Sequence, residues 1–250
     1  MKNIVERLPF TVGIATARDL HAVAKLRSVA YGRHLPGLGA KLQEPEPADY
    51  EAGCQVFVAK SKLDGEMLGT LRTHANLHKP LPLQASIDLP DGLADSLMVE
   101  TTRLSILGSP NSSLVRGALF KALYYYCLEQ GVDWMLAAGR RPVDRIYDGL
   151  LFEDVKETGA YYPMSHAAGL PHRVMKLSPT AARAKWAASG HPLYAFMVET
   201  QHPDISLDGA GSLRNPVRLP TRQIETRTLL SPFQNGIRQI ASLGMQLQAA

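Results

Sequence analysis

Runs of apolar residues divide the first 178 positions into short strands and amphipathic helices. Strands are predicted at 10–15, 54–60, 67–76, 98–107 and 134–139, and helices at 16–31 and 109–130. Asp64-Gly65 predicts a hairpin turn between the second and third strands. Pro142 favours a helix start, and that helix is expected to end near Phe152. Two further strands are expected at 153–162 and 172–177.

This order predicts an α+β fold, in which a mixed sheet carries helices on both faces. The pattern changes at Ser178, after which helices are expected at 178–189, 191–199 and 233–247. Residues 202–236 are rich in Pro, Asn, Ser and Arg and show little periodicity. We therefore predict a core domain at 1–178 and an extension, helical and partly irregular, at 179–250. The extension is expected to pack on the core, cover the site or join subunits into a homo-oligomer.

Composition limits the kinds of partner and the cellular compartment that can be expected. The net charge of +4 and pI of about 9.1 come without a dense Lys/Arg cluster, which argues against nucleic acid. The two cysteines show no metal-ligand spacing, and neither do His74, His78, His166 and His172, so no metal is expected. Glu6 and Arg7 interrupt any signal-peptide pattern, and no apolar run approaches the roughly 18 residues of a membrane span. The expectation is a cytoplasmic protein.

The stretch 98–131 carries the most distinctive chemistry. Glu100 and Arg103 lie in an apolar strand, where charged side chains cost free energy unless they are paired or used. A regular strand would point them to opposite faces, and a β-bulge would bring them toward one side. The following helix begins near Ser109, and the free N–H groups at such a start attract anions. The unit therefore predicts an acid–base pair beside an anion site.

Other charged residues have both a structural and a functional interpretation. Arg27 falls on the apolar face of the first helix, as part of an ion pair or as a substrate ligand. Asp49 belongs to the long loop 31–53, where a solvated charge is the more common explanation. Arg72 and Arg103 could pair with Glu100 in a buried network. Tyr147 is more often a packing residue than a proton donor.

The order of elements resembles the GNAT N-acyltransferase fold. The ending of that family's helix, Tyr-four residues-Gly-Phe, has a partial counterpart in Tyr147 and Phe152, with Leu151 in place of the glycine. The usual GNAT phosphate loop is replaced by the segment 108–112, Gly-Ser-Pro-Asn-Ser, which argues against ordinary acetyl-CoA binding.

A narrower resemblance, over residues 10–178, is to acyl-homoserine-lactone synthases and N-acyl amino acid synthases. It consists of Arg27 with Tyr31, Gly69-x-x-Arg72 and Glu100-x-x-Arg103, in that order. These families take the acyl group from acyl carrier protein. The lactone synthases place two aspartates after the first helix for S-adenosylmethionine, whereas Asp49 here has Ala48 and Glu51 around it. An amino acid acceptor is therefore expected.

The resemblance implies attack of an amine on an acyl thioester, with Glu100 as base and Tyr147 as the acid that protonates the thiolate. Backbone N–H groups of Leu104, Ser105 and Ile106 are expected to bind the oxyanion. The expected substrate ligands are Arg27, Tyr31, Asp49, Arg72 and Arg103. The expected ligands of the phosphopantetheine phosphate are Ser109, Asn111, Ser112 and Ser113.

No permanently bound cofactor is expected, because acyl-phosphopantetheine or acyl-CoA acts as co-substrate. An acidic carrier protein would meet a basic surface, for which the candidates are Arg116, Lys121, Arg140, Arg141 and Arg145. Two alternatives remain open: a GNAT acetyltransferase that uses acetyl-CoA or a short acyl-CoA, and a non-catalytic binding module with the same fold.

Overall fold

The computed structural model describes residues 4–93 and 95–213. The strands are β1 (Ile4–Val5), β2 (Phe10–Ile14), β3 (Cys54–Ser61), β4 (Met67–Ala75), β5 (Met98–Ile106), β6 (Trp134–Gly139), β7 (Glu153–Asp154), β8 (Tyr162–Met164), β9 (Leu170–Leu177) and β10 (Thr200–Gln201). The α-helices are α1 (Leu20–Gly32), α2 (Pro36–Lys41), α3 (Ser112–Glu129), α4 (Asp144–Asp148) and α5 (Pro179–Ala188). Shorter helical turns are η1 (Pro47–Tyr50), η2 (Pro82–Ala85), η3 (Asp91–Leu93), η4 (Ser165–Ala167) and the π-helical η5 (Ala195–Glu199).

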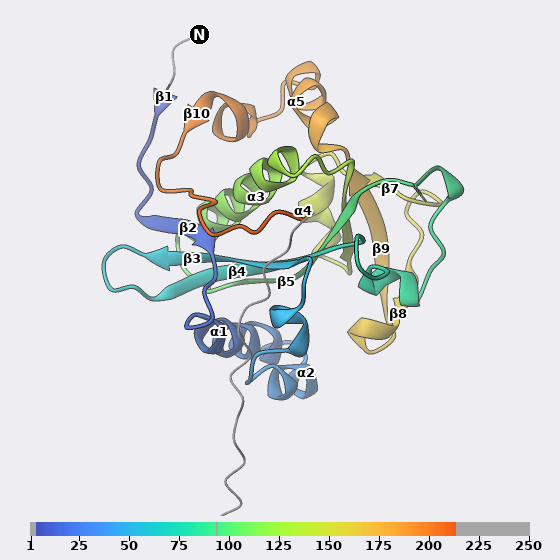
Figure 1. Ribbon diagram of the computed structural model, residues 1–250, viewed down its shortest axis with the longest axis horizontal. Helices are drawn as coiled ribbons and strands as arrows, with labels where there is room; N and C mark the ends of the chain where they lie inside the picture. The colour runs from blue at the N-terminus through green and yellow to red at the C-terminus, as the bar shows by residue number, and fades with distance from the viewer. Residues whose placement is uncertain (1–3, 94, 214–250) are drawn as a thin grey trace, which may run out of the picture. The chain divides into compact units, whose positions relative to one another are not determined.

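The main sheet has the order β2-β3-β4-β5-β6-β9-β7, with β8 paired to β9. Its pairs are antiparallel except for β5 and β6, which run parallel. Figure 1 shows α3 and α4 over one face of the sheet and α1 and α2 over the other. The expected mixed sheet with helices on both faces is confirmed, and so is the hairpin at Asp64-Gly65 that joins β3 to β4.

The expected strand at 153–162 is wrong. The strand β7 covers only two residues, and the Val155 N–H makes one more hydrogen bond to β9, to the Val174 carbonyl at 2.9 Å. The Asp154 carboxylate accepts a hydrogen bond from the Gly159 N–H at 2.9 Å, which closes a turn in place of the expected strand. Gly159 has φ +73°, a left-handed conformation that glycine adopts without strain. The chain returns to the sheet at β8. The expected helix at 233–247 lies outside the described residues.

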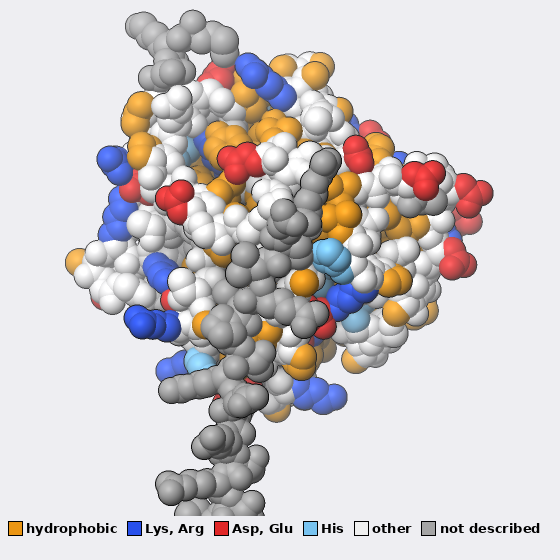
Figure 2. All heavy atoms as spheres, viewed as in Figure 1, with side chains coloured by type: hydrophobic (Ala, Val, Ile, Leu, Met, Phe, Trp, Pro, Cys, Tyr) orange, Lys and Arg blue, Asp and Glu red, His pale blue; other side chains and the backbone are white. Residues whose placement is uncertain are grey.

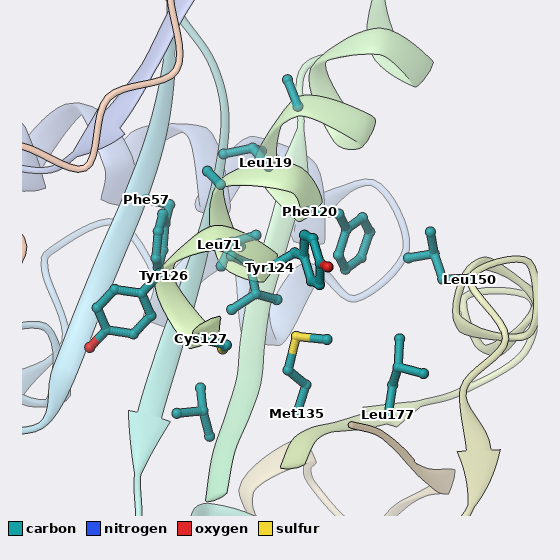
Figure 3. Close-up of a cluster of buried hydrophobic side chains, with 14 of the residues drawn as sticks. Phe57, Leu71, Leu119, Phe120, Tyr124, Tyr126, Cys127, Met135, Leu150 and Leu177 are labelled. Atoms are coloured by element: carbon teal, nitrogen blue, oxygen red, sulfur yellow. The ribbon is translucent and has the colours of Figure 1, made fainter. Parts of the chain in front are cut away.

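The main core lies between α3 and the sheet, where Figure 3 shows α3 side chains directed at those of β3 and β4. The rings of Phe57 and Tyr126 meet edge to face, with their centroids 5.5 Å apart. Trp186 of α5 is 2% exposed and packs against Tyr124, so this part of the segment after Ser178 joins the same core. Full burial of one such large apolar side chain contributes roughly 1.5–3 kcal/mol.

The surface carries both signs of charge. Figure 2 shows acidic and basic side chains interspersed on one face, with small apolar groups between them. None of the helices in the described part of the chain combines the length and the hydropathy of a membrane-spanning segment.

Candidate active site

A pocket opens where the two parallel strands part. Residues 98–101 of β5 pair with residues 134–137 of β6, and β5 then continues to Ile106 without β6 beside it. The gap forms a pocket of about 230 Å³. Its walls come from α1, α2, β5, the end of β6, α4 and the turn between β8 and β9: Ala30, Tyr31, His34, Leu35, Leu38, Glu100, Thr101, Thr102, Arg103, Leu104, Ser105, Ile106, Ala138, Arg140, Val143, Tyr147, His166, Ala167, Leu170 and His172.

A β-bulge at Arg103 shapes the β5 wall. Thr70 pairs with Ser105 and Arg72 with Thr102, so β5 holds one more residue than β4 between these two pairs. Arg103 has φ +54°, a left-handed conformation that costs an arginine roughly 1–2 kcal/mol. The irregularity lets Arg103 line the same pocket as Glu100, although the two are three positions apart on a strand. The bulge that their spacing required is therefore present.

Glu100 contributes a fully buried carboxyl to the pocket wall, with 0% of its surface exposed. Its Oε2 accepts a hydrogen bond from the Leu83 N–H at 2.9 Å. Within the described residues its Oε1 has no hydrogen-bond partner. Burial raises the pKa of Glu100 to about 8, although the Leu83 N–H and the charge of Arg72 act against the rise. A carboxyl with its pKa near neutrality and one free oxygen is suited to general base catalysis.

The predicted arginines belong to an ion-pair cluster beside this pocket. Arg27 Nη1 lies 2.8 Å from both carboxylate oxygens of Asp49, and Arg72 Nη1 lies 3.1 Å from Asp49 Oδ1. Glu46 joins the cluster, with its oxygens 2.6 and 2.8 Å from two nitrogens of Arg103 and 3.0 Å from Arg72 Nη1. The three arginines thus pair with Glu46 and Asp49. The alternative that Arg72 and Arg103 pair with Glu100 is wrong.

Two expectations about the loop 31–53 need correction. Asp49 is 2% exposed and is not a solvated charge, because Arg27 and Arg72 bind it inside the protein. Sequence reasoning missed Glu46, which forms a capping box with Asp49 around η1. The available signal was two acids three residues apart, Glu46 and Asp49, with Pro47 directly after the first. Burial opposes ionisation of Glu46, but the hydrogen bonds and charges of Arg103 and Arg72 lower its pKa to about 2.

Tyr147 enters the pocket from α4 and is 3% exposed. Its ring packs edge to face on Phe120 and Phe152, so the residue has a packing role whatever else it does. Burial raises the pKa of Tyr147 above its usual value, which keeps the hydroxyl protonated and able to donate. Leu151 has φ +62° at the position where the resembling GNAT motif has glycine, so the backbone keeps the turn without the residue that favours it.

Backbone groups of β5 face the gap beyond the bulge. The Leu107 N–H donates to the Leu68 carbonyl of β4 at 2.8 Å. Since N–H groups alternate along a strand, the N–H of Ile106 points away from β4 and toward the gap. By the same alternation the N–H of Ser105 points to β4, so the expectation that it binds an oxyanion is not supported. Leu104 and Ile106 also line the pocket, and Ile106 is the expected donor whose N–H this pattern turns toward the gap.

The predicted phosphate ligands lie beside the pocket and do not line it. Ser112 Oγ accepts the Ser109 N–H at 2.8 Å and donates to the Leu107 carbonyl at 3.1 Å, which folds the loop on itself. Asn111 precedes the first turn of α3, and Ser113 Oγ accepts from Arg116 at 3.4 Å. A Cβ on Gly108 would lie 3.0 Å from Arg33 Nη1, so a guanidinium lies against this loop.

The expectation that Lys121 lies on a basic surface that meets the carrier protein is wrong. Lys121 is 0% exposed, and its ammonium donates to the carbonyls of Phe196 and Thr200 at 2.5 Å. It therefore anchors the segment that contains η5 and β10. Arg140 lines the pocket, while Arg116, Arg141 and Arg145 lie outside the set of pocket residues.

Three histidines of the pocket were considered only as metal ligands or not at all. They are His34 between α1 and α2, His166 in η4 and His172 in β9. His166 Nε2 lies 3.9 Å from Glu100 Oε1. Burial, together with the charges of His172 and Arg103, lowers the pKa of His166 to about 4, so the ring is neutral. Among the described residues, no three His, Cys, Asp or Glu side chains are arranged to hold a metal ion.

Comparison with known proteins points to one family. Residues 22–174 match the family described as the N-acyl amino acid synthase FeeM. A solved structure of FeeM from uncultured soil microbes is similar, with a TM-score of 0.54 and 16% identity over 75% of this chain and 99% of that chain. The structure of BjaI, a CoA-dependent acyl-homoserine lactone synthase, in complex with MTA has a TM-score of 0.50 and 14% identity, over 80% of this chain and 96% of that chain. No curated protein matches the sequence. These likenesses confirm the GNAT-like acyltransferase fold.

Proposed function

Since the chain belongs to the FeeM N-acyl amino acid synthase family and is an N-acyltransferase, we propose that it moves an acyl group from acyl carrier protein to the amine of an amino acid. The observation that carries this proposal is the buried Glu100, whose free Oε1 borders the pocket at the gap between β5 and β6. The expected fold and chemistry are established by the family, whereas donor and acceptor are the proposal.

The acceptor binds through its two charged ends. Glu100 faces the amine, and its raised pKa lets it take a proton from an ammonium group. Arg103 and Arg140 give the pocket wall two guanidinium groups, which suit the carboxylate of an amino acid. The cluster behind Arg103 holds three arginines and two carboxylates, so one positive charge remains in excess. Asp49 and Arg27 act from this cluster, because they do not line the pocket.

Acyl transfer proceeds through a tetrahedral intermediate at the thioester carbon. The amine attacks after Glu100 removes its proton, and the β5 edge near Leu104 to Ile106 donates to the oxyanion. Tyr147, whose raised pKa keeps its hydroxyl protonated, gives its proton to the departing thiolate and recovers the second amine proton as the intermediate collapses to the amide. The acyl chain lies against the apolar side chains that α1 and α2 present, Leu35 and Leu38.

The phosphopantetheine arm of the donor passes along the loop before α3. The first N–H groups of a helix have no partner within it, and the Arg33 guanidinium lies against Gly108 beside them. This combination suits the phosphate of either a carrier-protein arm or CoA. Because the similar protein BjaI is CoA-dependent, acyl-CoA is the second candidate donor for this chain.

The test begins with lipid extracts of cells that express the protein, compared by mass spectrometry with a Glu100→Gln control. New N-acyl amino acids made only by the parent would support the proposal and identify the acceptor. Purified protein is then given dodecanoyl-carrier protein or dodecanoyl-CoA with that amino acid. Faster turnover of the carrier-protein substrate is expected. Turnover of the CoA substrate alone would reject the carrier protein as donor, and equal product from Glu100→Gln would reject Glu100 as the base.

A further inference from the structure

The reaction leaves a proton that the buried base cannot hand to solvent by itself. As the C–N bond forms and the C–S bond breaks, the attacking ammonium loses two protons and the thiolate gains one. The other proton must leave the protein in every turnover. Glu100 has 0% of its side chain exposed, and its Oε2 is already bound to the Leu83 N–H. Its outward path therefore runs through Oε1.

His166 is the side chain placed on that path. Its Nε2 lies 3.9 Å from Glu100 Oε1, while 24% of the His166 side chain is exposed and that of Glu100 is fully buried. Both residues line the pocket. Within the described residues, Glu100 Oε1 and His166 Nδ1 are buried atoms without hydrogen-bond partners. The backbone of Pro82 lies close enough to the His166 ring to act on its pKa, so the atom that needs a ligand or a water molecule is Glu100 Oε1.

The fold holds the two residues through one shared segment. The Leu83 N–H of η2 binds Glu100, and three residues later Ser86 Oγ accepts the Ser165 N–H at 2.8 Å. Ser165 begins η4, which carries His166. The turn that follows is tight, with φ +57° at Ala168 and +74° at Gly169. The segment 82–86 thus sets the position of the carboxylate and of the imidazole together.

We propose that His166 is the proton relay of this acyltransferase: it receives the acceptor's proton from Glu100, directly or through one water, and passes it to solvent. The proposal rests on the role proposed for Glu100. The groups that face His166 are Glu100 on β5, His172 on β9, and the guanidinium groups of Arg103 and Arg72. Burial, and then the charges of His172, Arg103 and Arg72, disfavour a lasting charge on the ring, and the Pro82 backbone only partly offsets them. The imidazole therefore accepts a proton briefly and is neutral again for the next cycle.

The test uses His166→Ala and His166→Gln with the acyl donor that the purified protein turns over. Gln keeps a side chain that can hydrogen-bond but cannot carry a proton in this range. We expect kcat to fall by about tenfold or more in both variants, with KM for the acceptor little changed. Added imidazole is expected to restore turnover to His166→Ala, with rates that rise with the basicity of the imidazole used.

A matched control is His172→Ala, which removes a second pocket imidazole whose Nδ1 lies 2.8 Å from the Leu170 carbonyl. Imidazole is not expected to accelerate this variant. Parent-like kcat in His166→Gln, or rescue of His166→Ala that is independent of imidazole basicity, would overturn the relay and leave a packing role. Glu100→Gln separates the two proposals: if it is active, the proposed base is wrong, and if it is inactive while both His166 variants work normally, the relay alone is wrong.

Discussion

Glu100→Gln is expected to stabilise the protein at neutral and alkaline pH, although it removes the proposed base. Burial raises the pKa of Glu100 from 4.5 to about 8 in the folded protein. Below about pH 4.5 the carboxyl is protonated in both states and nothing is lost. As the pH rises further, the unfolded chain ionises while the folded protein does not, so stability falls until the folded pKa is passed. A neutral amide undergoes no such loss.

The size of the effect follows from the two pKa values. A rise from 4.5 to about 8 corresponds to about 5 kcal/mol at alkaline pH, and about 3 kcal/mol of it is present at pH 7. These are upper figures, because a Gln amide also has to be satisfied at this buried site. Even half of this value is a large fraction of a typical stability of 5–15 kcal/mol. The gain should therefore be visible in equilibrium unfolding.

The assay is urea unfolding of both proteins, followed by circular dichroism at about pH 5, 7 and 8.5, the range over which the two states differ. Groups common to both proteins cancel in the difference between their free energies of unfolding. Glu157→Gln is the matched control, because Glu157 is an exposed carboxyl. A difference that grows with pH for Glu100→Gln only is expected. A difference that stays constant from about pH 5 to 8.5 would refute the raised pKa and with it the poised base.

Three further outcomes follow from the site. Asp49→Asn leaves Arg27 buried without its carboxylate partner and should lower the free energy of unfolding by about 3–5 kcal/mol in urea; a loss under about 1 kcal/mol would mean that the pair is not held as described. Tyr147→Phe keeps the ring contacts with Phe120 and Phe152 and should lower kcat by about tenfold or more without changing the urea midpoint; unchanged kcat would restrict Tyr147 to packing. Glu46→Gln removes a charge that offsets Arg72, so Arg72 should lower the pKa of Glu100 further and move the acid limb of the kcat–pH profile to lower pH. A limb that stays in place would show that Glu46 does not influence Glu100.

Much of the fold could be predicted because its signals are local. The hairpin between β3 and β4 is specified by Asp64-Gly65 and by alternation on either side of it, so its register needs no distant contact. The parallel pairing of β5 with β6 follows from a strand, a helix and a strand in succession. The prediction of a strand at 153–162 was wrong because a hydrogen bond from the Gly159 N–H to the Asp154 carboxylate competes with strand pairing.

The site was harder to predict than the fold, because its residues are far apart in the sequence and meet only in the folded protein. Glu46 binds Arg103, which is 57 positions further along the chain, and no periodicity links the two. The bulge could not be predicted from a glycine, because Arg103 itself occupies the left-handed position. Two hydrogen bonds to Glu46 hold it there. The sequence suggests that Lys121 is a surface residue of a helix, but the carbonyl groups of Phe196 and Thr200 accept hydrogen bonds from its buried ammonium. Each of these features needs tertiary contacts that spacing does not contain.

Glu46 and Glu100 lie near the same strand, β5, but have opposite pKa shifts. Glu46 has its pKa lowered to about 2 and remains an anion, whereas Glu100 has its pKa raised to about 8 and can exchange a proton. The charge of Arg72 acts to lower the pKa of Glu100. Glu46 and Asp49 both bind Arg72 and so offset that charge locally. Environments that push the pKa values of two acids apart assign them different roles. We infer that the ion-pair cluster does more than hold α1 and β4 together: because Glu46 and Asp49 offset two of the three arginine charges, Arg72 lowers the pKa of Glu100 less than it would alone.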